Sequence, residues 1–236
     1  RVLFRSERPT LEKKDFQLFM KRLRKRFGKG IRFFACGEYG ALRDRPHYHA
    51  IIFGLDFNDK ELWQIKDGHR LYVSKQLEQL WPHGYSTIGE ANFETAAYVA
   101  RYCLKKHKGE GSEKHYEVMD FFTGQIDYVQ QEFALMSRNP GIGKEWIKEH
   151  GDHVYDRDSI ILNYREVKPV RYYDDIYDNI DPDKMQEVRK QRRKQSYKNA
   201  WNNTQDRLLV REHIKQSSLN NLTRSYENEI ESIFDL

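Results

Sequence analysis

The first third of the chain changes from a helical to a strand-like spacing of hydrophobic residues. Apolar side chains first recur every three or four positions, which predicts a helix with one buried face: Phe16, Phe19, Met20, Leu23 and Phe27. Thr10 is expected to cap the start of this helix, and Gly28 marks its end. The helix would bury its phenylalanines and turn its arginines outward.

Two strand-like segments follow, at residues 31–37 and 47–55, with a polar turn between them. They predict an antiparallel hairpin. Because alternate side chains of a strand share a face, the second segment places four residues together: His47, His49, Ile51 and Phe53. Phe34, Cys36 and Glu38 share a face of the first segment, so the Glu38 carboxylate lies across from the histidines if the hairpin takes that register.

A later helix, expected to begin near Asn92, has two chemically different sides. Helical geometry gathers a polar set on one side: Tyr98, Arg101, Tyr102 and Lys105. Small apolar residues gather on the other: Ala96, Val99, Ala100 and Cys103. We expect the apolar side to pack on the sheet and the tyrosine side to stay accessible.

The rest of the chain gives weaker local signals. They predict, in chain order, a short helix at 74–81, a strand at 84–89, a hairpin within 120–137, a short helix at 144–150, a strand at 160–170, and a basic segment from about residue 181 that is helical or partly disordered. The pattern as a whole predicts an α+β fold, with a central antiparallel sheet of about five strands, the histidines on a middle strand and helices packed on one face.

Composition limits the class of protein. A chain of 236 residues with 38% hydrophobic content can bury one principal core. Two cysteines, Cys36 and Cys103, are too few for a disulfide framework. No apolar run is long enough for a membrane span, and no signal peptide opens the chain, so we expect a soluble intracellular protein.

The net charge of +5 is unevenly distributed. Residues 21–32 hold seven basic side chains and no acid, residues 184–198 hold seven against one glutamate, and three lysines follow Tyr102 closely. Each run alone is equally typical of a solvated helix face. Three such patches together favour a polyanionic partner.

Two constellations carry candidate chemistry. His47 and His49 lie on one face of a strand, so both imidazoles can bind one metal ion, with Glu38 as a third ligand. Tyr98 and Tyr102 share a helix face and offer two phenol nucleophiles. The alternatives are that the histidines are exposed or satisfied core residues, that the glutamate is a surface carboxylate, and that the tyrosines belong to an amphipathic core.

Three segments resemble the HUH endonuclease superfamily, and most of all the replication initiators of microviruses, the small single-stranded DNA phages. They read GEYG at 37–40, RPHYHAIIFG at 45–54 and YVARYCLKK at 98–106. Residues 136–138, 140–143 and 171–173 add to the likeness, which extends from Leu11 to Tyr173. The family's Thr-rich N-terminal strand is not recognisable in residues 1–8.

The resemblance implies roles for particular residues. Glu38, His47 and His49 would bind Mg2+ or Mn2+ as the cofactor. Tyr98 and Tyr102 would form phosphotyrosine links to DNA, with Lys105 assisting at the scissile phosphate. DNA contacts are expected from five basic residues: Arg22, Arg24, Arg26, Arg101 and Lys106.

The resemblance also implies an architecture and an activity. The fold would be an RRM-like or ferredoxin-like palm, with an endonuclease domain at 1–173 and a basic helical extension at 174–236. The protein would nick and rejoin single-stranded origin DNA during rolling-circle replication of a small phage genome, in the cytoplasm of a bacterial host and with a host replicative helicase as partner. A plasmid relaxase or transposase, a metal-dependent nuclease that uses water, and a non-catalytic nucleic-acid-binding module are the alternatives.

Overall fold

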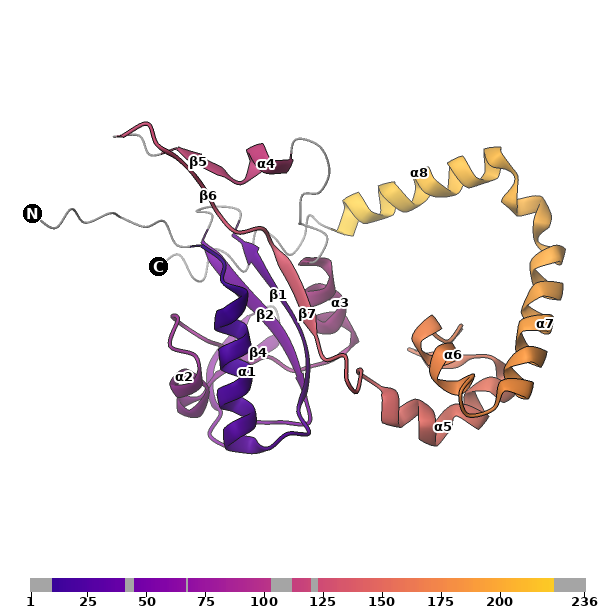
Figure 1. The fold of residues 1–236 in the computed structure, drawn as a ribbon, viewed down its shortest axis with the longest axis horizontal. Helices are drawn as coiled ribbons and strands as arrows, with labels where there is room; N and C mark the ends of the chain where they lie inside the picture. Colours follow the sequence, from indigo (N-terminus) through magenta and orange to yellow (C-terminus); the bar gives the residue numbers. More distant parts are fainter. Residues whose placement is uncertain (1–9, 41–44, 67, 103–111, 120–122, 223–236) are drawn as a thin grey trace, which may run out of the picture. The chain divides into compact units, whose positions relative to one another are not determined.

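The computed structural model describes residues 10–40, 45–66, 68–102, 112–119 and 123–222 (Figure 1). Within these ranges some side chains are not described: Lys66, Glu94, Tyr98, Arg101, Tyr102, Leu219, Asn220 and Leu222. The chain forms two compact units that divide between Asn139 and Pro140. The expected division after residue 173 would fall inside a set of helices that pack on one another.

The first unit has mixed secondary structure, which confirms the predicted α+β class. Its helices are α1 (Lys13–Phe27), α2 (Lys75–Leu80), α3 (Phe93–Tyr102) and α4 (Ser112–His115). Its strands are β1 (Arg32–Tyr39), β2 (Pro46–Phe53), β3 (Glu61–Lys66), β4 (His69–Val73), β5 (Glu117–Met119), β6 (Ile126–Tyr128) and β7 (Phe133–Met136).

The main sheet of the described residues has three antiparallel strands in the order β2-β1-β7. The predicted hairpin is confirmed as β1 and β2, and its register places Glu38 opposite His47 and Cys36 opposite His49. Within the described chain, the histidine strand is an edge of this sheet and not its middle, so the expectation of a middle strand is wrong. The middle strand is β1, which carries the carboxylate.

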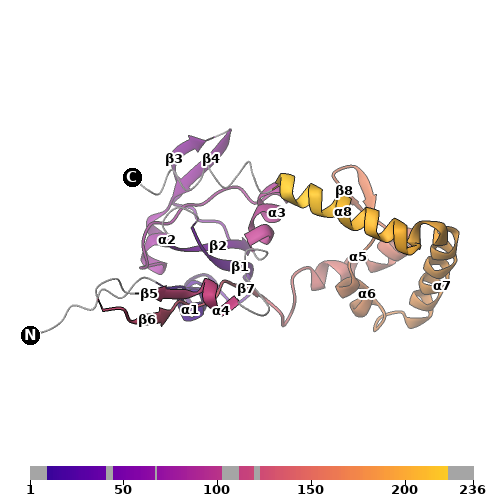
Figure 2. The same ribbon diagram turned by 90° about the horizontal axis from the view of Figure 1, so that it is seen from above.

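Helices cover both faces of this sheet (Figure 2). Helix α1 packs on one face through its phenylalanines and Leu23, which meet Ile31 and Ala35 of the sheet side. Helix α3 packs on the other face, where Val99 meets Cys36. The expectation that helices pack on one face is therefore wrong, because β1 is apolar on both sides and needs cover on both.

The start of α1 differs from the sequence prediction. Glu12 is its N-cap residue and makes no side-chain cap. Thr10 instead bonds within the sheet region: its Oγ1 accepts a hydrogen bond from the Gln130 N–H at 2.9 Å and lies 3.1 Å from the Tyr39 hydroxyl. Thr10 thus ties the chain before α1 to the segment that leads into β7.

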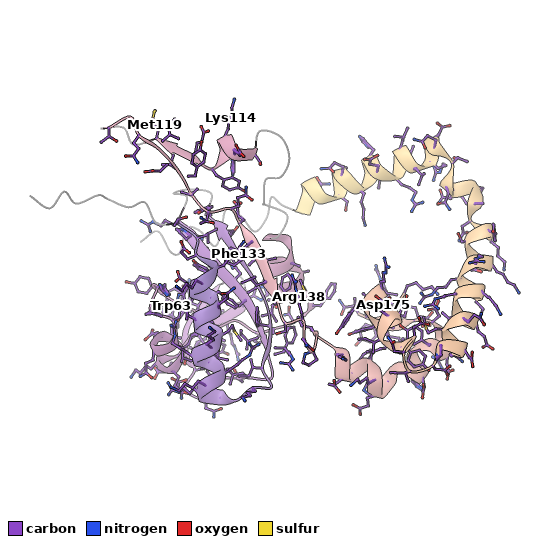
Figure 3. The ribbon with its side chains drawn as sticks, in the orientation of Figure 1. Trp63, Lys114, Met119, Phe133, Arg138 and Asp175 are labelled. Atoms are coloured by element: carbon purple, nitrogen blue, oxygen red, sulfur yellow. The ribbon has the colours of Figure 1, made fainter. Side chains whose placement is uncertain are left out.

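The smaller predicted elements are mostly present. The expected helix at 74–81 is α2, whose start is capped by the Ser74 hydroxyl accepting from Leu77 N–H at 3.1 Å. The expected hairpin is formed by β5 and β6. The expected strand at 84–89 is reduced to a single bridge between Tyr72 and Ile88, beside the β3–β4 hairpin that carries the exposed Trp63 (Figure 3).

The second unit is built from helices and one short hairpin. Its elements are α5 (Lys144–Arg157), β8 (Ile160–Leu162), β9 (Arg165–Val167), α6 (Arg171–Tyr177), α7 (Pro182–Lys198), the 3₁₀ helix η1 (Ala200–Asn203) and α8 (Gln205–Leu222). The expected strand at 160–170 is this hairpin, because Asn163 and Tyr164 adopt positive φ and reverse the chain. The segment after residue 181 is helical.

A salt-bridge network supports the core of this unit. Arg192 donates to Asp158 (Nε–Oδ1, 3.0 Å) and to Asp174 (Nη1–Oδ2, 2.7 Å). Hydrogen bonds to Asp158 and then Asp174 raise the pKa of Arg192. Cations in a basic run can therefore serve packing, as this one does. No helix among the described residues combines the length and hydrophobicity that crossing a membrane requires.

Gly37 sits where the sheet is most crowded, directly before Glu38. It faces Phe133 of β7 across the sheet (Figure 3), and a Cβ built at Gly37 would lie 2.7 Å from Phe133 Cε1 and 3.0 Å from Leu11 Cδ2. Those distances are too short for a side chain. Glycine at this position lets Phe133 lie against β1.

Gly37→Ala should destabilise the first unit by about 1–3 kcal/mol, because the added methyl must displace a buried ring. The measurement is urea unfolding followed by hydrogen exchange of the β1 amides. Gly30→Ala is the matched control, since nothing lies within 4 Å of a Cβ there. Phe133→Leu should recover part of the loss when combined with Gly37→Ala. Equal stability of the two alanine variants would contradict the packing assignment.

Candidate functional site

A carboxylate and an imidazole meet on the α3 side of the sheet. Glu38 is 2% exposed, and its Oε1 lies 2.9 Å from His49 Nε2. A buried carboxylate is costly unless it has a partner, so this contact stabilises Glu38 where it is. The structure thus brings together two of the three predicted metal ligands.

The third predicted ligand, His47, lies opposite Glu38 in the β1–β2 register. Its ring centroid is 6.5 Å from that of His49, with the two planes tilted by 69°. Both histidines are partly exposed. Among the side chains that the structure describes, no three His, Cys, Asp or Glu residues converge in metal-binding geometry. The three residues share a face, but His49 contacts Glu38 directly.

Tyr48, between the two histidines, fixes the strand from the opposite face. Its hydroxyl accepts a hydrogen bond from Glu12 N–H at 2.8 Å, and its ring packs on Trp81 and Phe133. Burial raises the pKa of Tyr48 to about 12, so the hydroxyl stays protonated. Sequence reasoning missed this positioning residue; the signal was a tyrosine on the alternate face of the histidine strand.

Helix α3 is anchored on the histidine side of the sheet. Asn92 Oδ1 accepts from Thr95 N–H and Thr95 Oγ1 accepts from Asn92 N–H, both at 2.8 Å, which fixes the start of the helix as predicted. Val99 is 8% exposed, and Cys36 Sγ donates to its carbonyl oxygen at 3.6 Å. The predicted apolar side of this helix is confirmed at Val99.

These contacts place the backbone of the tyrosine segment. Tyr98 and Tyr102 both belong to α3, which contacts β1 and β2. Cys36, which meets α3, is opposite His49 in register. The side chains of Tyr98, Arg101 and Tyr102 lie outside the description, as do residues 103–111 with Lys105 and Lys106. The tyrosine-bearing helix and the Glu38–His49 pair therefore occupy the same face of one sheet.

The arginines of α1 make contacts inside the unit. Arg22 Nε donates to the Leu80 carbonyl at 2.9 Å, and Arg24 Nη2 donates to the Ile31 carbonyl at 2.9 Å. Burial, then the charge of Arg32, lowers the pKa of Arg24. Arg26 Nη1 donates to a glutamine of α2, Gln79, at 2.9 Å. All three expected DNA contacts thus have intramolecular roles that link α1 to its neighbours.

Two motif segments of the second unit pack on each other. A Cβ at Gly141 would collide with the Tyr172 hydroxyl, and one at Gly143 with the Tyr173 hydroxyl. Gly143 also has a φ of +76°, which favours glycine. The segments at 140–143 and 171–173 are therefore complementary parts of one packing arrangement.

The chain is similar to replication proteins of phages. Residues 4–107 match the family model of replication-associated protein ORF2. The chain is 30% identical to Replication-associated protein VP4 of Bdellovibrio phage phiMH2K, covering 73% of this chain and 54% of that protein. It is 31% identical to Replication-associated protein ORF2 of Spiroplasma virus 4, covering 71% and 51%.

A third relative, Replication-associated protein ORF4 of Chlamydia phage 1, is 36% identical over 41% of this chain and 26% of that protein. The chain spans about half the length of the first two relatives. No solved structure matches the chain significantly. The matched family region includes Glu38, both histidines and both tyrosines of α3.

Val99→Ala should loosen α3 from the sheet without disturbing α1. The lost methyl groups lower the free energy of opening of α3 by about 1–2 kcal/mol. Hydrogen exchange of the α3 amides, compared with those of α1, measures this. Ala100→Ser, at an exposed neighbouring position, is the control. Unchanged α3 exchange in the valine variant would show that Val99 is not the anchor.

Proposed function

We propose that this chain is a phage replication initiator that nicks and rejoins single-stranded DNA through a tyrosine nucleophile. The observation that carries the proposal is the placement of α3, with its two tyrosines, on the sheet face that holds the Glu38–His49 pair. The similarity to phage replication-associated proteins supports the biological setting. The superfamily assigned on this basis is the HUH endonucleases.

Glu38, His47 and His49 are the proposed ligands of a divalent ion, Mg2+ or Mn2+. Their chemistry fits: one carboxylate and two imidazoles leave coordination positions open for water and a phosphate oxygen. Binding requires that His49 release its direct contact with Glu38 and share that carboxylate with the ion. When bound, such an ion supplies positive charge that stabilises the phosphoryl transition state.

The chain's own nucleophile is a phenol of α3. Tyr98 or Tyr102 loses its proton and attacks the phosphorus, and the bond from phosphorus to the 3′ oxygen breaks. The products are a 5′-phosphotyrosine and a free 3′-hydroxyl, so the bond energy is kept for rejoining. A phenol titrates near 10 in model compounds, so a nearby cation assists its ionisation.

The two tyrosines give the reaction a second step. Tyr98 is followed three residues later by Arg101, and Tyr102 by Lys105. On a helix each pair lies one turn apart, so each phenol has its own cation. While one tyrosine holds a 5′ end, the other can cut the regenerated origin, and the 3′-hydroxyl made there releases the first link.

The proposed partners follow from this chemistry. The substrate is single-stranded DNA at a viral origin, since the scissile phosphate must reach side chains on a sheet face. A host replicative helicase would supply the unwound strand, which places the reaction in the bacterial cytoplasm. A plasmid relaxase or transposase would use the same residues, and origin specificity separates these classes. A nuclease that uses water is distinguished by products free of protein.

Replacing both nucleophiles should abolish covalent capture of DNA. Tyr98→Phe or Tyr102→Phe alone should keep part of the activity, because the second phenol remains, whereas the double variant forms no adduct. The measurement is the fraction of labelled single-stranded origin DNA that stays with the protein after denaturation, with Mn2+ present. His49→Ala should reduce the rate of adduct formation on the order of 10²-fold, by removing electrostatic stabilisation.

Tyr173→Phe and Tyr177→Phe, which change the second Tyr-x-x-x-Tyr spacing of the chain, are the matched controls. They should leave adduct formation at the wild-type level. A covalent adduct formed by the Tyr98, Tyr102 double variant would reject the assigned nucleophiles. Cleavage with no protein attached at all would instead support the water-dependent nuclease.

A further inference from the structure

A basic groove runs along the outer side of α1, on the face of the unit away from the histidines. Its volume is about 440 Å³. In the described part of the chain it is lined by Glu12, Lys13, Lys14, Gln17, Leu18, Lys21 and Gln130. Three of these are lysines and one is an acid, so the groove is positively charged.

The groove lysines differ from the arginines of the same helix. Arg22 and Arg24 turn inward to backbone carbonyls, whereas Lys14 and Lys21 are exposed to solvent. Lys13 lies with its Nζ 5.8 Å from the ring centre of Phe133, so it also has a packing role. Lys14 and Lys21 are seven residues apart, which is about 10 Å along a helix.

Hydrogen bonds connect the groove to the strands that carry the candidate site. The Tyr39 hydroxyl, one residue after Glu38, donates to the Gln130 carbonyl at 2.8 Å. Tyr48, between the two histidines, accepts from Glu12 N–H. One wall and one end of the groove are therefore fixed to β1 and β2 at the Glu38 end of the sheet. The groove and the candidate site are separated by the thickness of that sheet.

We propose that this groove binds the phosphate backbone of the same single-stranded DNA that the initiator cuts, at nucleotides beyond the scissile phosphate. The inference rests on the proposed function and adds a second contact to it. A strand that leaves the site around the end of the sheet would meet Lys14 first and Lys21 next. Gripping it there would hold the cut end near the tyrosines during rejoining.

The lining suits a nucleic-acid strand. Ammonium groups attract phosphates as point charges, and amide side chains such as Gln17 and Gln130 bond phosphate and sugar oxygens. Leu18, 36% exposed, offers an apolar surface between them. The start of α1 lies in the groove, and the positive end of its helix dipole adds to the attraction. A contact of this kind reads the backbone and carries no sequence preference.

The test is the salt dependence of DNA binding by the whole chain. Lys14→Gln with Lys21→Gln removes two charges from the groove, and Lys29→Gln with Lys75→Gln removes two exposed charges elsewhere in the same unit. Fluorescence anisotropy with a labelled single-stranded oligonucleotide, repeated over a range of KCl concentrations without added metal, gives log K against log salt. Each phosphate contact on a single strand contributes a slope of about 0.7.

The groove variant should lower that slope by about 1.4, for two lost contacts, and weaken binding at low salt. The control variant should keep the wild-type slope. If the two variants behave alike, the groove is not a DNA contact and the inference is overturned. The proposed chemistry fails separately: in that case the groove variant still changes the slope, but wild-type protein forms no covalent adduct.

Discussion

The register of the β1–β2 hairpin is the constraint on which the site depends. It sets Glu38 opposite His47 and Cys36 opposite His49, so the carboxylate, both imidazoles and the contact point of α3 share one face. A shift of one residue would turn the histidines to the α1 side and leave Glu38 buried without its imidazole. Glycine at position 37, against Phe133, lets the third strand close beside this pair.

The two faces of the sheet divide the work of positioning. On one face, Tyr48 bonds to the backbone at the start of α1 and packs on Trp81, which holds the histidine strand from behind. On the other face, Val99 and Cys36 hold the tyrosine helix. A nucleophile and its electrostatic support are thus carried by separate elements that meet on rigid strands, which suits a reaction requiring close alignment.

Local patterns predicted what local physics decides. Strand alternation gave the shared face of Glu38 and the histidines, and helical spacing gave the buried side of α3. Partners distant in sequence could not be found this way: Thr10 bonds Gln130 instead of capping α1, and Arg24 serves a carbonyl instead of solvent. The cover on both faces did have a signal, since residues 31–36 form a nearly continuous apolar run, typical of a strand buried on both sides.

Paramagnetic broadening by Mn2+ is the most direct measurement of whether ion, histidine strand and tyrosine helix share one face. The account predicts that added Mn2+ broadens NMR signals of Val99 in α3 and of Cys36 in β1 strongly, and those of Lys21 on the far side of α1 much less. Glu38→Gln with His49→Gln should remove the effect. Broadening that spares α3, or that survives the double substitution unchanged, would contradict the account.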